Sequence, residues 1–213
     1  MRFLLSLLFF ANTLAFSNEQ CDTMKYQIIY INGPSSSGKT TLAQALQQAL
    51  EQPFLHIGID RVIGMMPAKI NDWEGNSVPL GFSWKEAIDE TGQAVYEIQA
   101  GPFAKRMDAT FKELVLTMAR MNHYILIDDV AFGHEDVSKW EAALKDYKVL
   151  WIGIHTPLAL LEEREKQRGN RRLGSARGQY FKVHKGVKYD LEFDTSKTPM
   201  EAIVQQIEKK LCS

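Results

Sequence analysis

The chain has 213 residues, of which 45% are hydrophobic and 24% are charged, and its formal net charge at pH 7 is −1. This length suits a single domain with a sizeable core, and the near-neutral charge excludes a general attraction to nucleic acid or to an anionic membrane. The two cysteines, Cys21 and Cys212, are too few for a disulfide scaffold and lack the spacing of metal ligands.

Residues 1–17 have the layout of a secretory signal peptide. A positive charge at Arg2 precedes the apolar run 3–10, and small residues follow at Ala11, Thr13, Ala15 and Ser17. The apolar run is too short for a membrane-spanning helix. We therefore expect export to the periplasm or the outside of the cell, with a cytoplasmic protein that starts at Met24 as the alternative.

Residues 28–41 combine a strand, a glycine-bounded loop and the start of a helix. The apolar run 28–31 predicts a buried strand, residues 33–40 fit the pattern G-x-x-x-x-G-K-[ST], and a helix is expected over about 39–51. This order of elements is typical of a phosphate-binding P-loop. A glycine-rich turn that binds nothing is the alternative, which the flanking strand and helix disfavour.

Glycines at both ends of this loop allow its N–H groups to turn inward around phosphate oxygens, and the following helix adds its positive dipole end. Lys39 supplies a charge to the outer phosphates, and the Thr40 hydroxyl is placed to bind Mg²⁺. The residues expected to bind the nucleotide are Gly33, Pro34, Ser35, Ser36, Ser37, Gly38, Lys39, Thr40 and Thr41.

A second strand is predicted over 54–59, ending at Asp60, with a short helix over 62–67. Because ligands of a parallel α/β sheet bind beyond the carboxyl ends of the strands, Asp60 should face the same crevice as the P-loop. A carboxylate there can orient and deprotonate an attacking hydroxyl. The alternative is that Asp60 is the N-cap of the short helix.

Residues 68–101 are the least regular stretch of the sequence. They contain Trp73, Phe82 and Trp84 among glycines, prolines and charges. Long irregular segments are usually functional or disordered, and the aromatic content argues against disorder. We predict that this segment covers an acceptor pocket; the alternative is a structural excursion whose aromatic side chains fill the core.

A long helix is predicted from Pro102, because apolar residues then recur at spacings of three and four. The apolar strand 124–129 that follows ends in two acids, Asp128 and Asp129, which is the Walker B arrangement. Such a strand carries a carboxylate to the edge of the sheet where Mg²⁺ binds. We assign the metal to Asp128, acting through water, although the sequence leaves Asp129 open.

The remaining elements alternate regularly. Helices are expected over 136–144 and about 157–167, strands over 149–154 and 189–194, and a closing amphipathic helix over 199–211. Alternating strands and helices predict one domain over 24–213, an α/β/α sandwich of three layers with a parallel sheet. Together with the P-loop, this arrangement resembles the P-loop NTPases of the nucleoside- and shikimate-kinase kind.

Residues 164–178 form a basic segment interleaved with glycines. A charge run is usually a solvated surface, but in a phosphate-handling protein a mobile lid of arginines would bind phosphoryl oxygens bidentately. We predict such a lid from this segment. The arginines of the segment are Arg164, Arg168, Arg171, Arg172 and Arg177.

From about Met24 onward, the chain resembles the chloramphenicol phosphotransferase family of P-loop kinases. The resemblance rests on residues 33–40, 58–67, 127–130 and 150–153 and on scattered positions over 164–195. It implies ATP-dependent phosphorylation of a small-molecule hydroxyl, with Asp60 as the base and with Arg168 and Arg171 on the transferred group. The sequence departs from the family at its N-terminus and over 73–98, which leaves the acceptor open.

The prediction is therefore an O-phosphotransferase that uses MgATP and a small hydroxyl compound. A kinase for another metabolite, such as a nucleoside, a sugar or an aminoglycoside-like compound, is one alternative. A nucleotide-dependent switch is another, although the guanine-reading motif Asn-Lys-x-Asp is absent from the sequence. The scarcity of ATP outside the cytosol favours the start at Met24, and the sequence gives no oligomeric state.

The positions of the two cysteines lead to a further prediction. Cys21 precedes the first strand, and Cys212 ends the last helix, so both should lie near the amino edge of the sheet. In an exported chain we expect them to form a disulfide, which would tie both ends to the domain.

Overall fold

The computed structural model describes residues 24–74, 80–169 and 172–212. Residues 1–17, Cys21 and Arg171 lie outside these ranges. The signal peptide, the disulfide and the role of Arg171 therefore stay predictions. None of the described helices is long and apolar enough to cross a membrane.

A five-stranded parallel sheet forms the centre of the described chain. Every strand that the sequence predicts in it is present, within two residues of its expected ends. The central strand is buried along its whole length, which explains its apolar run. The order of the strands is β2 (Phe54–Gly58), β5 (Tyr124–Asp129), β1 (Ile28–Asn32), β6 (Val149–His155) and β7 (Leu191–Asp194).

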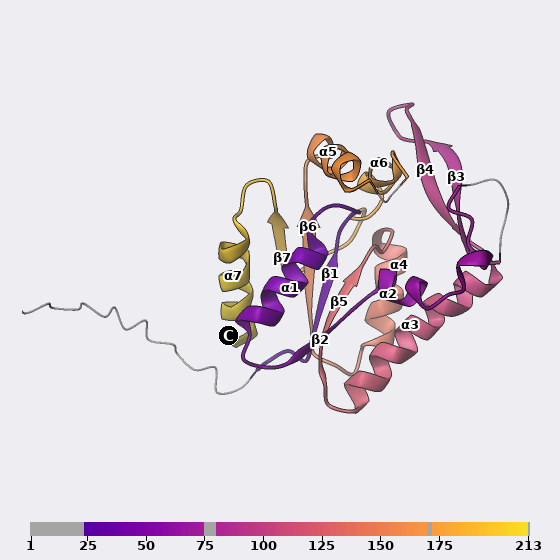
Figure 1. The fold of residues 1–213 in the computed structure, drawn as a ribbon. Helices are drawn as coiled ribbons and strands as arrows, with labels where there is room; N and C mark the ends of the chain where they lie inside the picture. The colour runs from indigo at the N-terminus through magenta and orange to yellow at the C-terminus, as the bar shows by residue number, and fades with distance from the viewer. Residues whose placement is uncertain (1–23, 75–79, 170–171, 213) are drawn as a thin grey trace, which may run out of the picture.

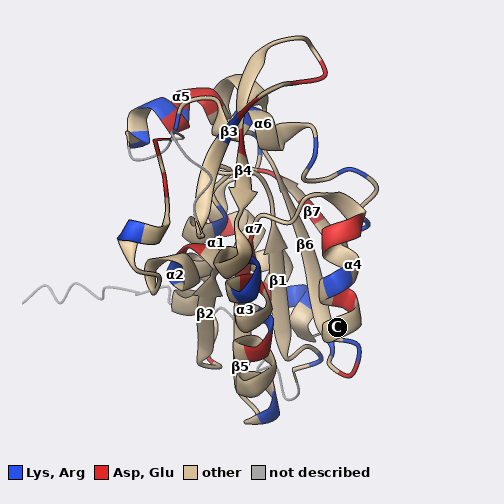
Figure 2. Cartoon of the chain, turned by 90° about the vertical axis from the view of Figure 1, so that its right-hand side faces the viewer, with Lys and Arg blue, Asp and Glu red and all other residues tan. Residues whose placement is uncertain are grey.

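Helices cover both faces of this sheet, so the predicted three layers are confirmed. On one face lie α1 (Lys39–Ala49) and α7 (Met200–Cys212), and on the other lie α3 (Pro102–Arg120) and α4 (Gly133–Ala143) (Figure 1). Lys and Arg alternate with Asp and Glu along α3 and α4 (Figure 2), as the near-zero net charge leads one to expect.

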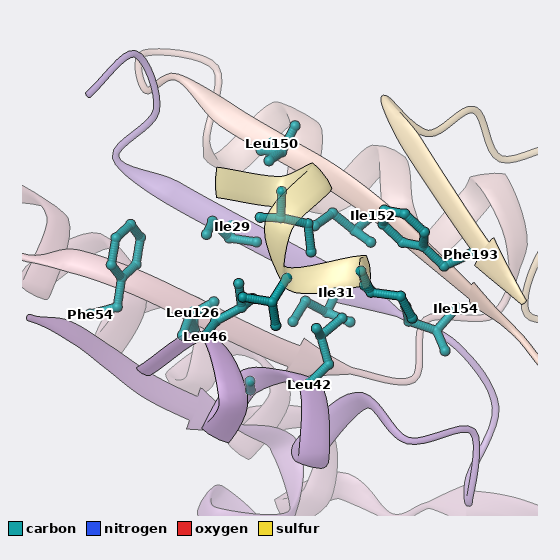
Figure 3. Packing of buried hydrophobic residues seen from close by; sticks show 14 of the residues in the cluster. Ile29, Ile31, Leu42, Leu46, Phe54, Leu126, Leu150, Ile152, Ile154 and Phe193 are labelled. Carbon is teal, nitrogen blue, oxygen red and sulfur yellow. The ribbon is translucent and has the colours of Figure 1, made fainter. Parts of the chain in front are cut away.

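Neighbouring residues of a strand supply opposite core layers, because side chains alternate across a sheet. Ile31 packs with Leu42 and Leu46 of α1 (Figure 3), whereas Tyr30 packs with Phe111 of α3. Each fully buried aliphatic side chain contributes roughly 1.5–3 kcal/mol. The two layers together fix the sheet and the loops at its carboxyl edge.

The expectation of an irregular segment over 68–101 was wrong. The segment contains a short 3₁₀ helix (Ala68–Ile70) and an antiparallel hairpin of β3 (Phe82–Ile88) and β4 (Ala94–Ala100). Asp89 closes its turn by accepting hydrogen bonds from the backbone N–H groups of Thr91 and Gln93. The hairpin carries exposed charges and lies outside the main sheet, so it lacks the apolar run by which most of the other strands were predicted.

Two helices begin three residues earlier than expected. α2 spans Ile59–Gly64, so β2 ends at Gly58 and Asp60 lies in the first helical turn. α4 begins at Gly133, whose left-handed φ of 71° a residue with a side chain rarely adopts. In both cases the helix starts immediately after the strand or its short loop, without a capping side chain to mark it in the sequence.

The segment after β6 forms α5 (Leu158–Arg168) and α6 (Ser175–Tyr180). These helices lie above the carboxyl ends of the strands, and α6 lies beside β4 (Figure 1). At the opposite edge of the sheet, the Lys25 N–H donates to the carbonyl of Leu211, 3.0 Å away. The first described residues therefore meet the last turn of α7.

Candidate active site

The loop between β1 and α1 is bent as a phosphate cradle requires. Ser36 has φ 66° and Gly38 has φ 99°, both in the left-handed region. A Cβ on Gly33 would lie 2.7 Å from the carbonyl oxygen of Ile154, so only glycine fits there. Successive turns of this kind direct N–H groups toward a bound anion.

Side chains from three other segments hold the carbonyls of this loop. The hydroxyls of Thr156 and Thr195 donate to the carbonyl of Ser37 at 3.3 and 3.1 Å. Arg164 donates to the carbonyl of Ser36 at 3.3 Å. The loop is thus fixed before any ligand binds, which reduces the entropy that phosphate binding costs.

Lys39 and Thr40 both point toward the acid at the end of β5. The ammonium of Lys39 is buried, donates to the carbonyl of Pro34 at 3.0 Å and lies 3.9 Å from Asp128 Oδ1. The hydroxyl of Thr40 donates to Asp128 Oδ2 at 2.5 Å. The structure thus brings together the lysine, the hydroxyl and the carboxylate that the two Walker motifs predict.

The two acids of β5 have different surroundings. Asp129 points to the other face, where its carboxylate accepts from the hydroxyl of Tyr30 at 3.0 Å and from the indole N–H of Trp140 at 2.8 Å. Burial raises the pKa of Asp129, although these donors oppose the rise. Its contacts anchor α4, and Asp128 is the acid that faces the P-loop.

Asp128 is buried but remains charged at neutral pH. Burial, the strongest influence, favours the neutral acid, but the neighbouring His56 ring, the Lys39 ammonium and the Thr40 hydroxyl together hold the pKa of Asp128 below its usual value. A negative carboxylate beside a hydroxyl is a suitable oxygen ligand set for a hard cation. The described residues contain no group of three or more acidic, histidine or cysteine ligands, and Mg²⁺ typically takes its remaining ligands from water and phosphate.

Asp60 lines the same cavity as the P-loop. It is not the N-cap of α2, because Gly58 takes that position and α2 has no side-chain capping bond. The alternative of a helix cap is therefore not supported. The role of Asp60 as a base stays a prediction.

The cavity has a volume of about 1200 Å³ and extends from the P-loop to the β3–β4 hairpin. Phe82, Trp84 and Ile98 of the hairpin form an apolar wall. Trp73 stacks against Phe82, with ring centroids 6.2 Å apart and an interplanar angle of 11°. Segment 68–101 thus contributes both to the core of the hairpin and to the wall of the cavity. Its role as the cover of an acceptor pocket stays a prediction.

A family comparison agrees with this geometry. The family described as chloramphenicol phosphotransferase-like protein matches residues 26–212. The chain belongs to this family.

A relative of the chain is "Putative O-phosphotransferase Rv2636" of Mycobacterium tuberculosis (strain ATCC 25618 / H37Rv). It is 26% identical over 181 residues, which cover 85% of this chain and 80% of the relative. A gluconokinase from Sinorhizobium meliloti 1021 has a TM-score of 0.56 at 15% identity, over 87% of this chain and 91% of that one. An APS kinase from Mycobacterium tuberculosis has a TM-score of 0.54 at 11% identity, over 90% and 100%. These likenesses show the P-loop kinase fold.

The arginines of the predicted lid differ in their surroundings: some contact other side chains, and one is exposed. Arg177 donates to Asp89 at 2.6 Å and to Glu162 at 3.0 Å. Arg172 lies over the ring of Tyr96, 4.2 Å from its centroid. Arg168 is exposed and lines the cavity, so of the two arginines assigned to the phosphoryl group it is the one that the structure describes at the site.

Two residues that line the cavity were not predicted from the sequence. His56 lies on β2 beside Asp128, and the side chain of Gln179 on α6 accepts from the N–H of Ser35 at 2.6 Å. A histidine among the apolar residues of a predicted strand was a signal for His56. Gln179 gave none, because its contact with the P-loop joins residues 144 positions apart.

Proposed function

We propose that the protein transfers the terminal phosphoryl group of ATP to a hydroxyl of a small molecule. One observation carries this proposal: Asp60, Lys39 and an apolar wall line a single cavity. Ligand pockets are usually about 300–1,000 Å³, so a cavity of about 1200 Å³ is large enough for two substrates together. This size favours a transferase over a switch that binds a nucleotide alone.

The P-loop amides and Lys39 would hold the outer phosphates. Thr40 and Asp128 would hold Mg²⁺, which when bound neutralises phosphate charge. Asp60 would accept the proton of the acceptor hydroxyl as that oxygen forms a bond to the terminal phosphorus. The bond from this phosphorus to the bridging oxygen then breaks, and ADP leaves with both electrons. Arg168, with Arg171, would stabilise the charge that spreads over the transferred group.

The acceptor would lie between Asp60 and the hairpin. The apolar wall of Phe82, Trp84 and Ile98 supports a compound with an apolar body and a reactive hydroxyl. The family's name makes chloramphenicol the first compound to test, and the name of the mycobacterial relative supports an oxygen acceptor. A sugar or nucleoside acceptor remains the alternative within the same reaction.

The test is ATP consumption by the purified protein against a panel of hydroxyl compounds that includes chloramphenicol. The expected result is consumption of ATP that depends on one compound, with a product heavier by one phosphoryl group in the mass spectrum. The same panel with Asp60→Asn is the control. Nucleotide binding without consumption for any compound would favour the switch.

A further inference from the structure

His56 is a buried polar side chain without a hydrogen-bond partner. Its side chain is 4% exposed, and neither ring nitrogen forms a hydrogen bond to any part of the chain that the structure describes. Buried polar groups are nearly always hydrogen-bonded, and an exception calls for an explanation. His56 also lines the cavity, so its ring lies at the site rather than deep in the core.

The register of the sheet explains why His56 reaches Asp128. β2 and β5 run side by side with Gly58 opposite Asp128 and His56 opposite Leu126. A Cβ on Gly58 would lie 3.0 Å from the Asp128 carbonyl oxygen. Because Gly58 has no side chain, the imidazole from two residues earlier on the same face can approach the carboxylate.

The two side chains lie close together but are not hydrogen-bonded. His56 Nε2 lies 3.6 Å from Asp128 Oδ2, which is too long for a hydrogen bond. The same oxygen already accepts from Thr40, whereas Oδ1 faces the ammonium of Lys39. A small movement of either side chain would give Oδ2 a second donor and leave Oδ1 directed toward the phosphate side.

We propose that His56 is a positioning residue for the divalent cation of this site. Its Nε2–H donates to Asp128 Oδ2 when the cation is bound, and it holds the carboxylate so that Oδ1 faces the hydrated cation. The inference rests on the proposed function, because it requires a metal–nucleotide complex at Thr40 and Asp128. Groups that orient metal-binding carboxylates in this way affect metal affinity by about 10- to 100-fold.

The first test is the affinity for Mn²⁺, measured by electron paramagnetic resonance in the presence of a non-hydrolysable ATP analogue. His56→Leu removes both ring nitrogens and should weaken Mn²⁺ binding by about 10- to 100-fold. His56→Gln places an amide N–H near the position of Nε2 and should bind within a few-fold of the wild type. His123→Leu makes the same substitution at an exposed histidine and should have no effect.

The outcomes separate the two proposals. Equal Mn²⁺ affinity in the wild type and in folded His56→Leu would overturn the positioning role and leave the proposed function intact. A wild type that binds the analogue without any Mn²⁺ would overturn both. Weak binding by His56→Gln as well as by His56→Leu would contradict the role of the N–H donor.

A second measurement is made on the wild type and uses a variant only to assign the signal. The ¹⁵N resonance of His56 Nε2, assigned by its loss in His56→Gln, should move when Mg²⁺ is added to the complex with the analogue, because the N–H then gains a hydrogen bond. The resonance of His123 is the internal control. An unchanged His56 signal at saturating Mg²⁺ would overturn the proposal.

Discussion

The two sides of the cavity, here called the floor and the cover, are stabilised in different ways. The floor, made of the P-loop and the end of β5, rests on the strands β1 and β5, whose apolar side chains are almost all fully buried. The cover, made of the β3–β4 hairpin and α6, combines a small apolar cluster around Phe82 with charged contacts: Arg177 pairs with Asp89 and Glu162, and Lys182 pairs with Glu97. Apolar burial fixes the P-loop side of the cavity, whereas the opposite side depends on ion pairs as well as on its small apolar cluster.

The two parts of the cover are closely joined. A Cβ on Gly178 of α6 would lie 2.7 Å from the carbonyl oxygen of Tyr96 in β4. The start of α6 is also tied to α5. Glu165 of α5, which is 1% exposed, accepts from the Ser175 hydroxyl at 2.5 Å and from the Ala176 N–H at 2.8 Å. We therefore expect the hairpin and α6 to move together, while the floor stays in place.

The largest effect should come from Lys39→Ala, which removes the buried charge of the floor. Phosphoryl transfer should fall by at least about 10³-fold, since a preorganised cation at the phosphates is lost. Turnover at saturating ATP measures this, with Lys209→Ala, an exposed lysine at the opposite edge, as the control. Near-normal transfer by the folded variant would contradict the P-loop assignment.

Asp60→Asn should keep ATP binding and lower turnover by about 10²-fold or more, because the amide cannot accept the hydroxyl proton. The comparison of kcat with the dissociation constant for ATP checks this. Asp146→Asn, at an exposed acid away from the cavity, should behave as the wild type. A variant with unchanged turnover and a lower Tm would instead give Asp60 a structural role.

Arg177→Met should loosen the cover and leave the floor intact. We expect amide hydrogen exchange in β4 and α6 to rise by roughly tenfold or more, with exchange in β1 and β5 unchanged. The KM for the acceptor should rise more than the dissociation constant for ATP. Arg120→Met removes an exposed ion pair of α3 and is the control; equal exchange in both variants would show that ion pairs do not hold the cover.

A smaller, pH-dependent effect should come from His184, on the segment that joins α6 to β7. Burial, helped by the neighbouring His155, lowers the pKa of His184 from 6.5 to about 4. The stability it contributes is fully present above pH 6.5 and is lost as the pH falls toward 4, because only the unfolded chain takes up the proton in that window.

The loss should be about 2 kcal/mol, less than the full shift implies, because the ring is partly solvated. Urea unfolding at pH 7 and pH 4.5 measures it. His184→Gln should flatten this dependence, and His123→Gln should not. An equal slope in His184→Gln and the wild type would assign the acid sensitivity to other groups.

The floor could be predicted from sequence because its signals are local. A buried strand, a glycine-bounded loop and a helix follow one another along the chain. The apolar run before Asp128 marks the other strand of the floor, β5. The choice between Asp128 and Asp129 could not be made, since it depends on which face of the sheet carries α1. The role inferred for His56 likewise depends on a strand register that the sequence does not state.

The cover was predicted less well because its contacts join distant segments. Arg177 meets Asp89 across 88 positions of the chain, and no local pattern encodes such a pair. Its arginines were therefore predicted as one mobile lid, whereas Arg172 and Arg177 are held against the hairpin. The turn that Asp89 closes was the overlooked signal for the hairpin.

The contact between Lys25 and Leu211 has a practical consequence. The start of β1 and the end of α7 lie at the amino edge of the sheet (Figure 1), whereas the residues that line the cavity include the P-loop and Asp128 at the carboxyl edge. A short linker between these positions would close the domain into a ring, so that new ends can be opened elsewhere by circular permutation. An affinity tag or a solid support attached after the last helix would leave the entrance to the cavity clear.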